Sequence, residues 1–273
     1  MTTARLTTMT DTSRKELRGQ IGAARLRFDR LIRSADPQAR PPGSDWNVQE
    51  VTAHVLTAAH RYREVAQGRT FQVAATPRDL DAINATELRA ALAPIPQMAQ
   101  ELLELAPVMD DFFDRVHDDP LAFPFHGGIR VSGISAQTNW LAELLLHGED
   151  IARATRQSWD LAERDLLLVL SGVMAMAPAY VRRDLPPGTE LMIALGIPGA
   201  RPWVMHIHDG VAEARERRPE DRPDAVLRVP ASTFTKLLYQ RLGPVQAVRH
   251  GLLVVGGRRP WRSLQMQSMF EAP

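Results

Sequence analysis

The hydrophobic pattern of this chain changes its period at about residue 158, and this change constrains the fold more than any other feature. Before it, apolar residues recur every three or four positions, which is the pattern of amphipathic helices. After it, apolar and polar residues alternate in short stretches, which is typical of half-buried strands. Helices followed by mixed strands and helices predict two domains of different class. We therefore expect an α+β protein, with an all-helical domain at residues 1–157 and a smaller domain of strands and helices at residues 158–273.

Four helices are predicted in the first part, and they are expected to form a bundle. The second begins at Asn47, a favourable N-cap, and Glu50 three residues later completes a capping box. The third is interrupted by Pro94 and Pro96, because proline removes a helical hydrogen bond. A long connection rich in glycine and proline, residues 118–133, precedes the fourth, and such crossovers are one way in which bundles are wired. The predicted ranges are 13–34, 47–66, 84–117 and 136–155.

The second part is predicted to contain both strands and helices. Period-2 alternation indicates the strands, and Pro260 at the first position of the closing segment favours a helix there. The predicted strands are 190–197, 203–210, 225–231 and 251–257, and the predicted helices are 164–182, 232–243 and 260–270.

Composition and charge exclude several classes of protein. The formal net charge is +1 with no acidic or basic block, so no nucleic-acid partner is expected. The absence of cysteine excludes disulfides, cysteine-ligated zinc and a cysteine nucleophile. The most apolar window, residues 166–181, is shorter than a membrane span, and residues 1–19 lack the apolar core of a secretion signal. We therefore expect a cytoplasmic protein with no membrane partner.

A carboxylate and an imidazole lie one turn apart on the fourth predicted helix. Glu143 and His147 are at positions i and i+4, so their Cβ atoms are about 5–6 Å apart on one face. Trp140, Leu144 and Ile151 neighbour the same stripe, so the pair is expected to face the bundle interior. A buried carboxylate is costly unless it is paired or binds a metal ion, so one of these must hold for Glu143.

His54, on the second predicted helix, also points inward. Two histidines and one glutamate from facing helices are the ligand set of an open catalytic metal site, with zinc as the preferred ion and iron, nickel or manganese as alternatives. The spacing leaves a second interpretation open. Glu143 and His147 can simply hydrogen-bond each other, and His54 can be a core histidine whose hydrogen bonds are satisfied.

Two motifs resemble known metalloenzymes. "WNVQEVTAH", residues 46–54, resembles the second-helix motif of the DinB-like superfamily. "ELLLHGEDIARAT", residues 143–155, resembles the fourth-helix motif of the mycothiol-dependent maleylpyruvate isomerase family. Residues from about 187 to the end resemble the C-terminal domain of that family, which is related in fold to sterol carrier protein 2. The resemblance implies a DinB-like four-helix bundle followed by an SCP2-like domain.

The resemblance also implies a chemistry. It implies a divalent metal, usually zinc, held by His54, Glu143 and His147. It implies a low-molecular-weight thiol, mycothiol, as cosubstrate, whose thiolate adds to a small electrophilic substrate. Either isomerisation of the substrate or transfer of the thiol follows. The expected partners are therefore small molecules, and the protein is expected to be a monomer or a homodimer.

An acidic substrate needs a cationic group near the metal, and the family uses an arginine of the C-terminal domain. The candidates are Arg241, Arg249, Arg258 and Arg259, since arginine favours carboxylate recognition. Each of them could equally be a solvated surface residue. Arg61, two turns after His54, is a further candidate for the mouth of the site.

Four other polar residues have two interpretations each. Asp150 could accept a hydrogen bond from His147 or be a solvated helix charge. His126 could close over the site, but an ordinary loop is favoured. His206 and His208 share one face of a predicted strand and could bind a metal, but no third ligand is evident, so a plain sheet surface is favoured.

Two functions without catalysis compete with the enzyme. In the first, the chain is a non-catalytic metal-binding protein. In the second, the C-terminal domain carries a small apolar ligand, and the bundle has no active role.

Overall fold

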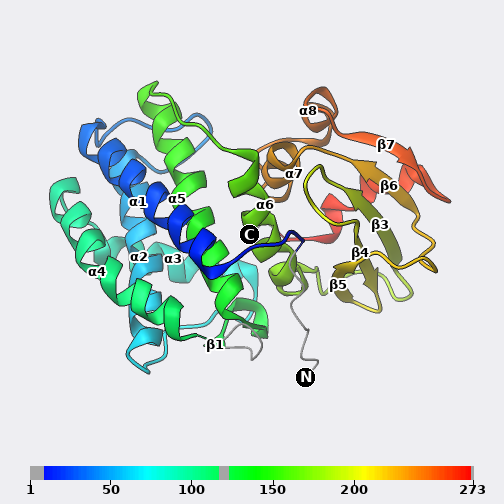
Figure 1. Ribbon diagram of the computed structural model, residues 1–273, viewed down its shortest axis with the longest axis horizontal. Helices are drawn as coiled ribbons and strands as arrows, with labels where there is room; N and C mark the ends of the chain where they lie inside the picture. The colour runs from blue at the N-terminus through cyan, green and yellow to red at the C-terminus, as the bar shows by residue number, and fades with distance from the viewer. Residues whose placement is uncertain (1–8, 117–122, 272–273) are drawn as a thin grey trace.

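The structure is a computed structural model, and it describes residues 9–116 and 123–271. Figure 1 shows a helical part, built from the first half of the chain, beside a part in which a five-stranded sheet is packed with helices. The predicted α+β class is confirmed. Residues 1–8, 117–122 and 272–273 lie outside the described residues, and residues 118–122 belong to the predicted crossover.

The helical part is a bundle of four long helices. Helix α1 packs against α5, and α2 packs against both α4 and α5. Each helix turns an apolar stripe inward, and Phe28, Val55, Met98 and Leu141 are at most 1% exposed. The bounds are α1 Arg14–Ser34, α2 Val48–Ala66, α4 Ile95–Arg115 and α5 Gly133–Thr155.

The capping box predicted for the second helix is present. The Asn47 side chain accepts a hydrogen bond from the Glu50 amide at 2.9 Å, and the Glu50 carboxylate accepts one from the Asn47 amide at 2.7 Å. These bonds satisfy two amides that helical geometry leaves free. They also fix where α2 begins, and hence the direction in which His54 points.

The predicted interruption near Pro94 is confirmed, and it divides the predicted third helix into two separate helices. A short break around Pro94 separates α4 from α3 (Pro77–Ala91). Thr76 and Asp79 form a second capping box, which starts α3 well before the predicted position. Helix α3 packs against α2 and so forms one wall beside the bundle.

The end of the crossover is a small hairpin that packs on the second part of the chain. Strands β1 (Phe123–Pro124) and β2 (Arg130–Val131) flank the turn η1 (His126–Gly128). Gly127 has a φ of 72°, and a Cβ there would lie 2.6 Å from the Cβ of Ala179. Glycine is therefore needed both for the left-handed conformation and for this close approach.

The second part holds the sheet, with strand order β5-β4-β3-β6-β7. Within this sheet β3 and β6 pair in parallel, and the other neighbouring strands pair antiparallel. The apolar side chains of one face pack into the same core cluster as Phe234 of α7. The bounds are α6 Glu163–Met176, η2 Ala177–Tyr180, β3 Glu190–Gly196, β4 Trp203–His208, β5 Val211–Glu216, β6 Ala225–Arg228, α7 Ala231–Leu238, α8 Pro244–Arg249 and β7 Leu253–Gly256.

Two predictions for the second part need correction, and one strand was missed. Helix α6 ends at Met176 and continues as a 3-10 turn, because Pro178 cannot extend the helical hydrogen bonds. Strand β5 was not predicted. The predicted closing helix is wrong, since two 3-10 turns, η3 (Pro260–Gln265) and η4 (Gln267–Met269), occupy that segment.

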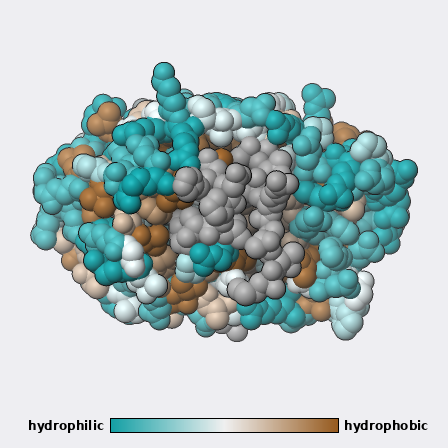
Figure 2. Space-filling view, turned by 60° about the horizontal axis from the view of Figure 1, so that its bottom comes forward, coloured by the Kyte–Doolittle hydropathy of each residue, from teal (hydrophilic) through white to brown (hydrophobic). Residues whose placement is uncertain are grey.

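Helix α6 joins the two parts of the molecule. It packs against α5 on one side and α7 on the other, and one hydrophobic cluster runs through the bundle and the inner face of the sheet. On the face drawn in Figure 2, hydrophilic side chains cover most of the coloured surface. None of the helices in the described ranges combines the length and apolarity needed to cross a membrane.

Candidate metal and substrate site

A cavity of about 290 Å³ lies between the bundle and the second part of the chain. Its walls come from α2, α3, α5 and α6, from the hairpin turn η1, and from the segment that follows α7. His54, Glu143 and His147 all line it, so these side chains point from α2 and α5 into this cavity and not into a core closed by the bundle alone. Arg61 and Arg241 line it as well.

The three predicted ligands converge on one point. Nε2 of His54 lies 3.6 Å from Oε2 of Glu143, and Nε2 of His147 lies 3.3 Å from the same oxygen. One candidate ligand atom from each residue lies within 4.8 Å of the others. A tetrahedral ion with bonds of 2.0–2.2 Å separates its ligand atoms by about 3.4 Å, so the spacing fits one such ion.

The charges at this site are strongly coupled. Burial, the positive charge of His147 and that of Arg61 lower the pKa of His54 to about 4, although Glu143 opposes them. Burial would raise the pKa of Glu143, but contact with His147 and its charge lower it to about 2. Burial would lower the pKa of His147, but Asp150 and Glu143 raise it to about 9. Without an ion, His147 is therefore the cation that balances Glu143.

Two polar atoms at the site lack hydrogen bonds. Nδ1 of His54 and Oε2 of Glu143 are buried, and neither forms a hydrogen bond within the described residues, although Oε2 is in ion-pair contact with Nε2 of His147 at 3.3 Å. An unsatisfied buried polar atom costs about 1–3 kcal/mol. A cation among these ligands would satisfy the carboxylate oxygen, so the donor set fits a divalent metal.

Asp150 contacts and orients His147. The sequence had left open whether Asp150 accepts a hydrogen bond from His147 or is a solvated helix charge. Oδ2 of Asp150 lies 3.2 Å from Nδ1 of His147. When Nδ1 donates to a carboxylate, Nε2 is left as the lone-pair donor that faces the cavity. Arg241 in turn donates two hydrogen bonds to Asp150, at 2.6 and 2.8 Å, and a third at 3.0 Å to the carbonyl of Leu146.

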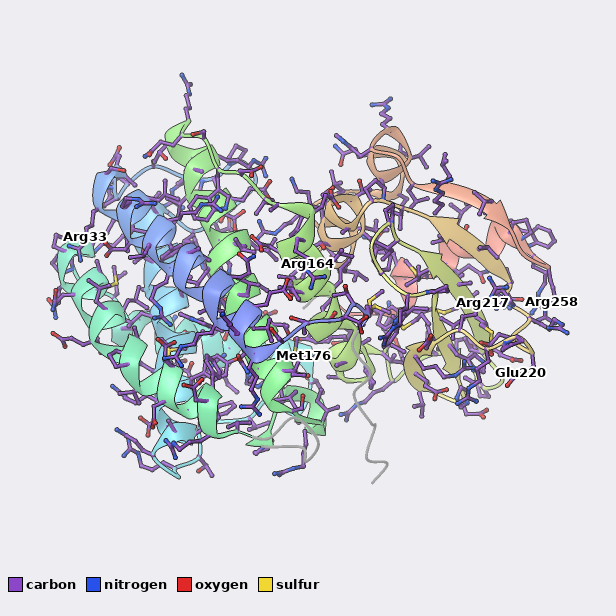
Figure 3. The ribbon with its side chains drawn as sticks, viewed as in Figure 1. Arg33, Arg164, Met176, Arg217, Glu220 and Arg258 are labelled. Carbon is purple, nitrogen blue, oxygen red and sulfur yellow. The ribbon has the colours of Figure 1, made fainter. Side chains whose placement is uncertain are left out.

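Of the four candidate arginines, only Arg241 lines the cavity. Arg258 and Arg259 bind Asp224, with closest distances of 3.4 and 2.7 Å. Arg258 lies at the outer end of the sheet, far from Met176, which lines the cavity near the middle of the molecule (Figure 3). Arg249 is the last residue of α8 and is exposed.

Arg61 reaches the cavity from α2, as its position two turns after His54 indicated. It donates to Glu87 at 2.6 and 2.9 Å and to Asn84 at 2.7 Å, so α3 holds its guanidinium in place. His126 lies 3.4 Å from this guanidinium.

His126 is a buried wall of the cavity and not a solvated loop residue. Its side chain accepts a hydrogen bond from the Ala74 amide at Nδ1, at 3.0 Å, and the residue is 4% exposed. Burial and the charge of Arg61 lower the pKa of His126 to about 4. The neutral ring therefore carries its proton on Nε2. The neighbouring pair of glycines, with Gly127 in the left-handed region, was the only trace of this tight turn in the sequence.

Two tyrosines of the cavity were missed by the sequence analysis. Burial and the negative charge of Glu143 raise the pKa of Tyr180 to about 12. Burial and the same charge also raise the pKa of Tyr239 well above its usual range. Both hydroxyls therefore keep their protons at neutral pH. Tyr180 is the last residue of the 3-10 turn η2, and Tyr239 caps the end of α7.

The family profile described as the mycothiol maleylpyruvate isomerase N-terminal domain matches residues 18–152. Residues 18–152 therefore belong to the family of mycothiol maleylpyruvate isomerase N-terminal domains. The matched segment contains His54, Glu143, His147 and Asp150, whereas Arg241 lies beyond it.

One solved structure is similar to this chain in fold. A crystal structure of the mycothiol-dependent maleylpyruvate isomerase is similar with a TM-score of 0.52 and 12% identity, over 87% of this chain and 93% of that chain. A histidine-to-alanine mutant of that enzyme gives a TM-score of 0.49 and 11% identity, over 84% and 90% of the two chains. No curated protein matches the sequence significantly.

Proposed function

We propose that this protein is a divalent-metal- and thiol-dependent enzyme that isomerises a small electrophilic substrate or transfers a thiol to it. The observation that carries the proposal is the convergence of the His54 and His147 Nε2 atoms on one Glu143 oxygen at a cavity wall. The family and the similar fold of a mycothiol-dependent maleylpyruvate isomerase support it. We also propose that the bundle is DinB-like and that the C-terminal part is SCP2-like.

His54, Glu143 and His147 would hold the ion, and zinc suits two imidazoles and a carboxylate. A divalent ion supplies a nucleophile at neutral pH, because it stabilises the thiolate form of a bound thiol. The chain has no cysteine, so the thiol must come from a small molecule. We take mycothiol as that cosubstrate, in line with the family.

The remaining cavity residues would bind and orient the electrophile. Arg61 and Arg241 place two guanidinium groups at the cavity, which suits a substrate that carries a carboxylate. Tyr180 and Tyr239 keep their protons, and the neutral His126 carries a proton on Nε2. These groups can donate hydrogen bonds to the negative charge that develops on a substrate carbonyl when a thiolate adds to a conjugated double bond.

Metal content and turnover test this proposal together. By elemental analysis after dialysis, His54→Ala and Glu143→Gln should each retain one ion fewer than the wild type. The matched control is His60→Ala, because His60 on the same helix pairs with Glu101 at 2.7 Å and does not line the cavity. The control should retain the metal content of the wild type.

The second part of the experiment measures turnover when the protein is given mycothiol together with maleylpyruvate or another small electrophile. Formation of a geometric isomer without thiol loss identifies an isomerase, and stoichiometric thiol loss identifies a transferase. An ion bound at this site without either reaction would favour the non-catalytic metal-binding protein. If His54→Ala and Glu143→Gln keep the full metal content, the metal site is refuted.

A further inference from the structure

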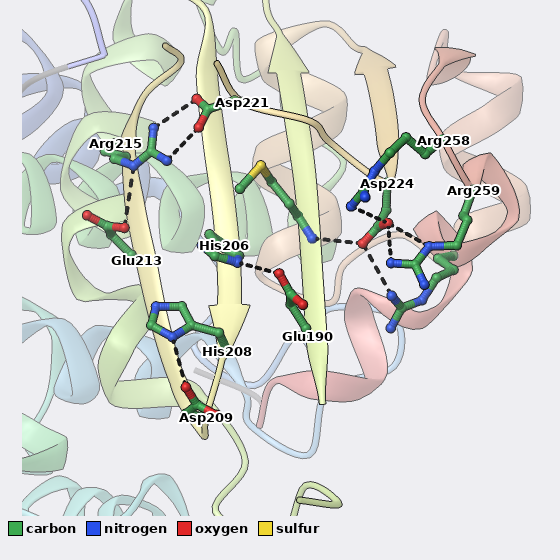
Figure 4. Close-up of polar contacts among 12 residues, drawn as sticks. Glu190, His206, His208, Asp209, Glu213, Arg215, Asp221, Asp224, Arg258 and Arg259 are labelled. Atoms are coloured by element: carbon green, nitrogen blue, oxygen red, sulfur yellow. Dashed lines mark hydrogen bonds and ion pairs between the residues drawn. The ribbon is translucent and has the colours of Figure 1, made fainter. Parts of the chain in front are cut away.

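A second cluster of metal-ligand side chains lies on the sheet, away from the cavity. His206 and His208 project from β4 on the face opposite the core, and their ring centroids are 4.5 Å apart (Figure 4). Glu213 of β5 lies directly across from His206 in the antiparallel register. One candidate ligand atom from each of these three residues lies within 4.8 Å of the others. None of them lines the cavity described above.

We propose that His206, His208 and Glu213 form a second site for a divalent transition-metal ion. Alternate residues of a strand point the same way, so the two imidazoles share one face, and the neighbouring strand supplies the carboxylate. Two imidazole nitrogens and a carboxylate oxygen suit zinc, nickel or copper, whereas magnesium and calcium prefer sites made entirely of oxygen.

The hydrogen bonding of His206 also points to a ligand. Nε2 of His206 is buried, and it forms no hydrogen bond within the described residues. Oε1 of Glu190 on β3 lies 3.4 Å from this nitrogen, so a fourth oxygen is within reach of the same place. An ion there would satisfy the ring nitrogen and draw on three adjacent strands.

Glu213 is available to such an ion, although Arg215 lies beside it. The Arg215 guanidinium forms a bidentate pair with Asp221 at 2.7 and 2.9 Å. Its contact with Glu213 is longer, at 3.4 Å. The arginine charge is therefore already balanced, and the partly exposed Glu213 carboxylate can turn toward the histidines.

His208 also lies beside Asp209, whose carboxylate is 3.5 Å from Nδ1 and whose side chain is 87% exposed. This aspartate starts the turn that joins β4 to β5, and it can accept a hydrogen bond from Nδ1 while Nε2 binds the ion. Because β5 is the edge strand of the sheet, a bound ion would fasten that edge to β4.

The test uses full-length protein in which the first site is disabled by His54→Ala and Glu143→Gln. Calorimetric titration with zinc or nickel alone should show one remaining ion. Adding His206→Ala should weaken it by roughly 100-fold or more, because two ligands hold a dication far less tightly than three. The matched control is His250→Ala, since His250 is exposed at the end of α8 and should leave the affinity within about twofold.

The protein with His54→Ala and Glu143→Gln could fold poorly. The second site is then tested by introducing His206→Ala alone into the wild-type chain. There His206→Ala should remove one of two bound ions, and His54→Ala should remove the other. If His206→Ala leaves both the stoichiometry and the affinity unchanged, the second site does not exist. Loss of an ion with His206→Ala but not with His54→Ala would refute the cavity site and leave this one standing.

Discussion

At the scale of single residues, Asp150 determines which nitrogen of His147 faces the cavity. Replacing it as Asp150→Asn keeps an oxygen that can accept from Nδ1 but removes the charge that makes the ring a better ligand. We expect the affinity of the cavity site for zinc to fall by about 10–100-fold. Competition titration with a chromophoric chelator measures this change.

The control is the neighbouring carboxylate, Glu149, which pairs with Lys236 at 2.5 Å and does not contact His147. Glu149→Gln should leave zinc affinity close to that of the wild type. Equal losses in the two variants would mean that net charge, and not the orientation of His147, governs the site.

His126 makes the free energy of unfolding depend on pH. Its pKa is about 4 in the folded protein, because burial and Arg61 disfavour the charged ring. An unfolded histidine titrates near about 6.5, so the unfolded chain binds more protons between these values and stability falls as the pH drops. His126→Asn keeps an acceptor for the Ala74 amide without this titration. Between about pH 7.5 and pH 5 the wild type should lose roughly 2 kcal/mol more than the variant.

Denaturant titrations of metal-free protein at the two pH values measure this difference. Removal of the metal keeps changes in ion binding out of the comparison. A wild type and a variant that lose stability in parallel would show that the His126 ring can accept a proton in the folded state.

At the scale of elements, the close packing of α5 against α6 depends on Gly172. A Cβ at this position would overlap Oγ1 of Thr138 on α5 and lie 2.9 Å from its Cβ. Thr138 is fully buried and donates to the carbonyls of Ile134 and Ser135, so it cannot move away freely. Gly172→Ala should therefore lower the free energy of unfolding by about 1–3 kcal/mol.

Gly22 on α1 provides the matched comparison, because a Cβ there has nothing within 4 Å. Gly22→Ala should stabilise the protein by about 0.5–1 kcal/mol through helix propensity. Chemical denaturation measures the free energy of unfolding of both variants. It shows whether steric overlap with Thr138 outweighs the gain in helix propensity at Gly172. Stabilisation by both substitutions would show that α5 and α6 separate easily.

The sequence predicted most of the long elements, because their faces pack against one core. Helices α2 and α5 begin within a few residues of their predicted positions, since capping side chains and the apolar period agree. Strand β5 was missed because its inward residues are small alanines, and only the Asp209–Gly210 turn hinted at a hairpin. The closing helix did not form, since Trp261 and Leu264 are 65% and 74% exposed and bury no apolar face.

The missed strand β5 also explains why the sequence did not predict the cluster of His206, His208 and Glu213. Without β5 the sequence offered no third ligand, and the side chain of Glu213 could not be placed beside His206 and His208. At the cavity, by contrast, the sequence did predict which three side chains come together. Helical spacing alone brought Glu143 and His147 together, and the inward face of α2 added His54.

At the scale of the whole molecule, the periodic pattern cannot predict which arginine reaches the cavity. The choice depends on how the segment after α7 lies against α5, and this follows from packing between the two parts of the chain. Arg241 is placed there by its contacts with Asp150 and with the carbonyl of Leu146. A separate pair, Lys236 with Glu149, also joins α7 to α5. The same arginine thus supports the ligand His147 and contributes charge to the cavity wall.

A double-mutant cycle tests whether this contact couples the two parts of the protein. Asp150→Asn and Arg241→Gln should each lower the free energy of unfolding of the metal-free protein, but the double variant should lose about 1–2 kcal/mol less than their sum, because the second change has no partner left to lose. Arg25→Gln is the control, since Arg25 pairs with Asp110 at 2.8 Å and is similarly buried, but shares no partner with Asp150. Its effect should add to that of Asp150→Asn within about 0.5 kcal/mol. Additivity in both cycles would mean that the C-terminal part rests on the bundle without supporting His147, and Arg241 would then act on the substrate alone.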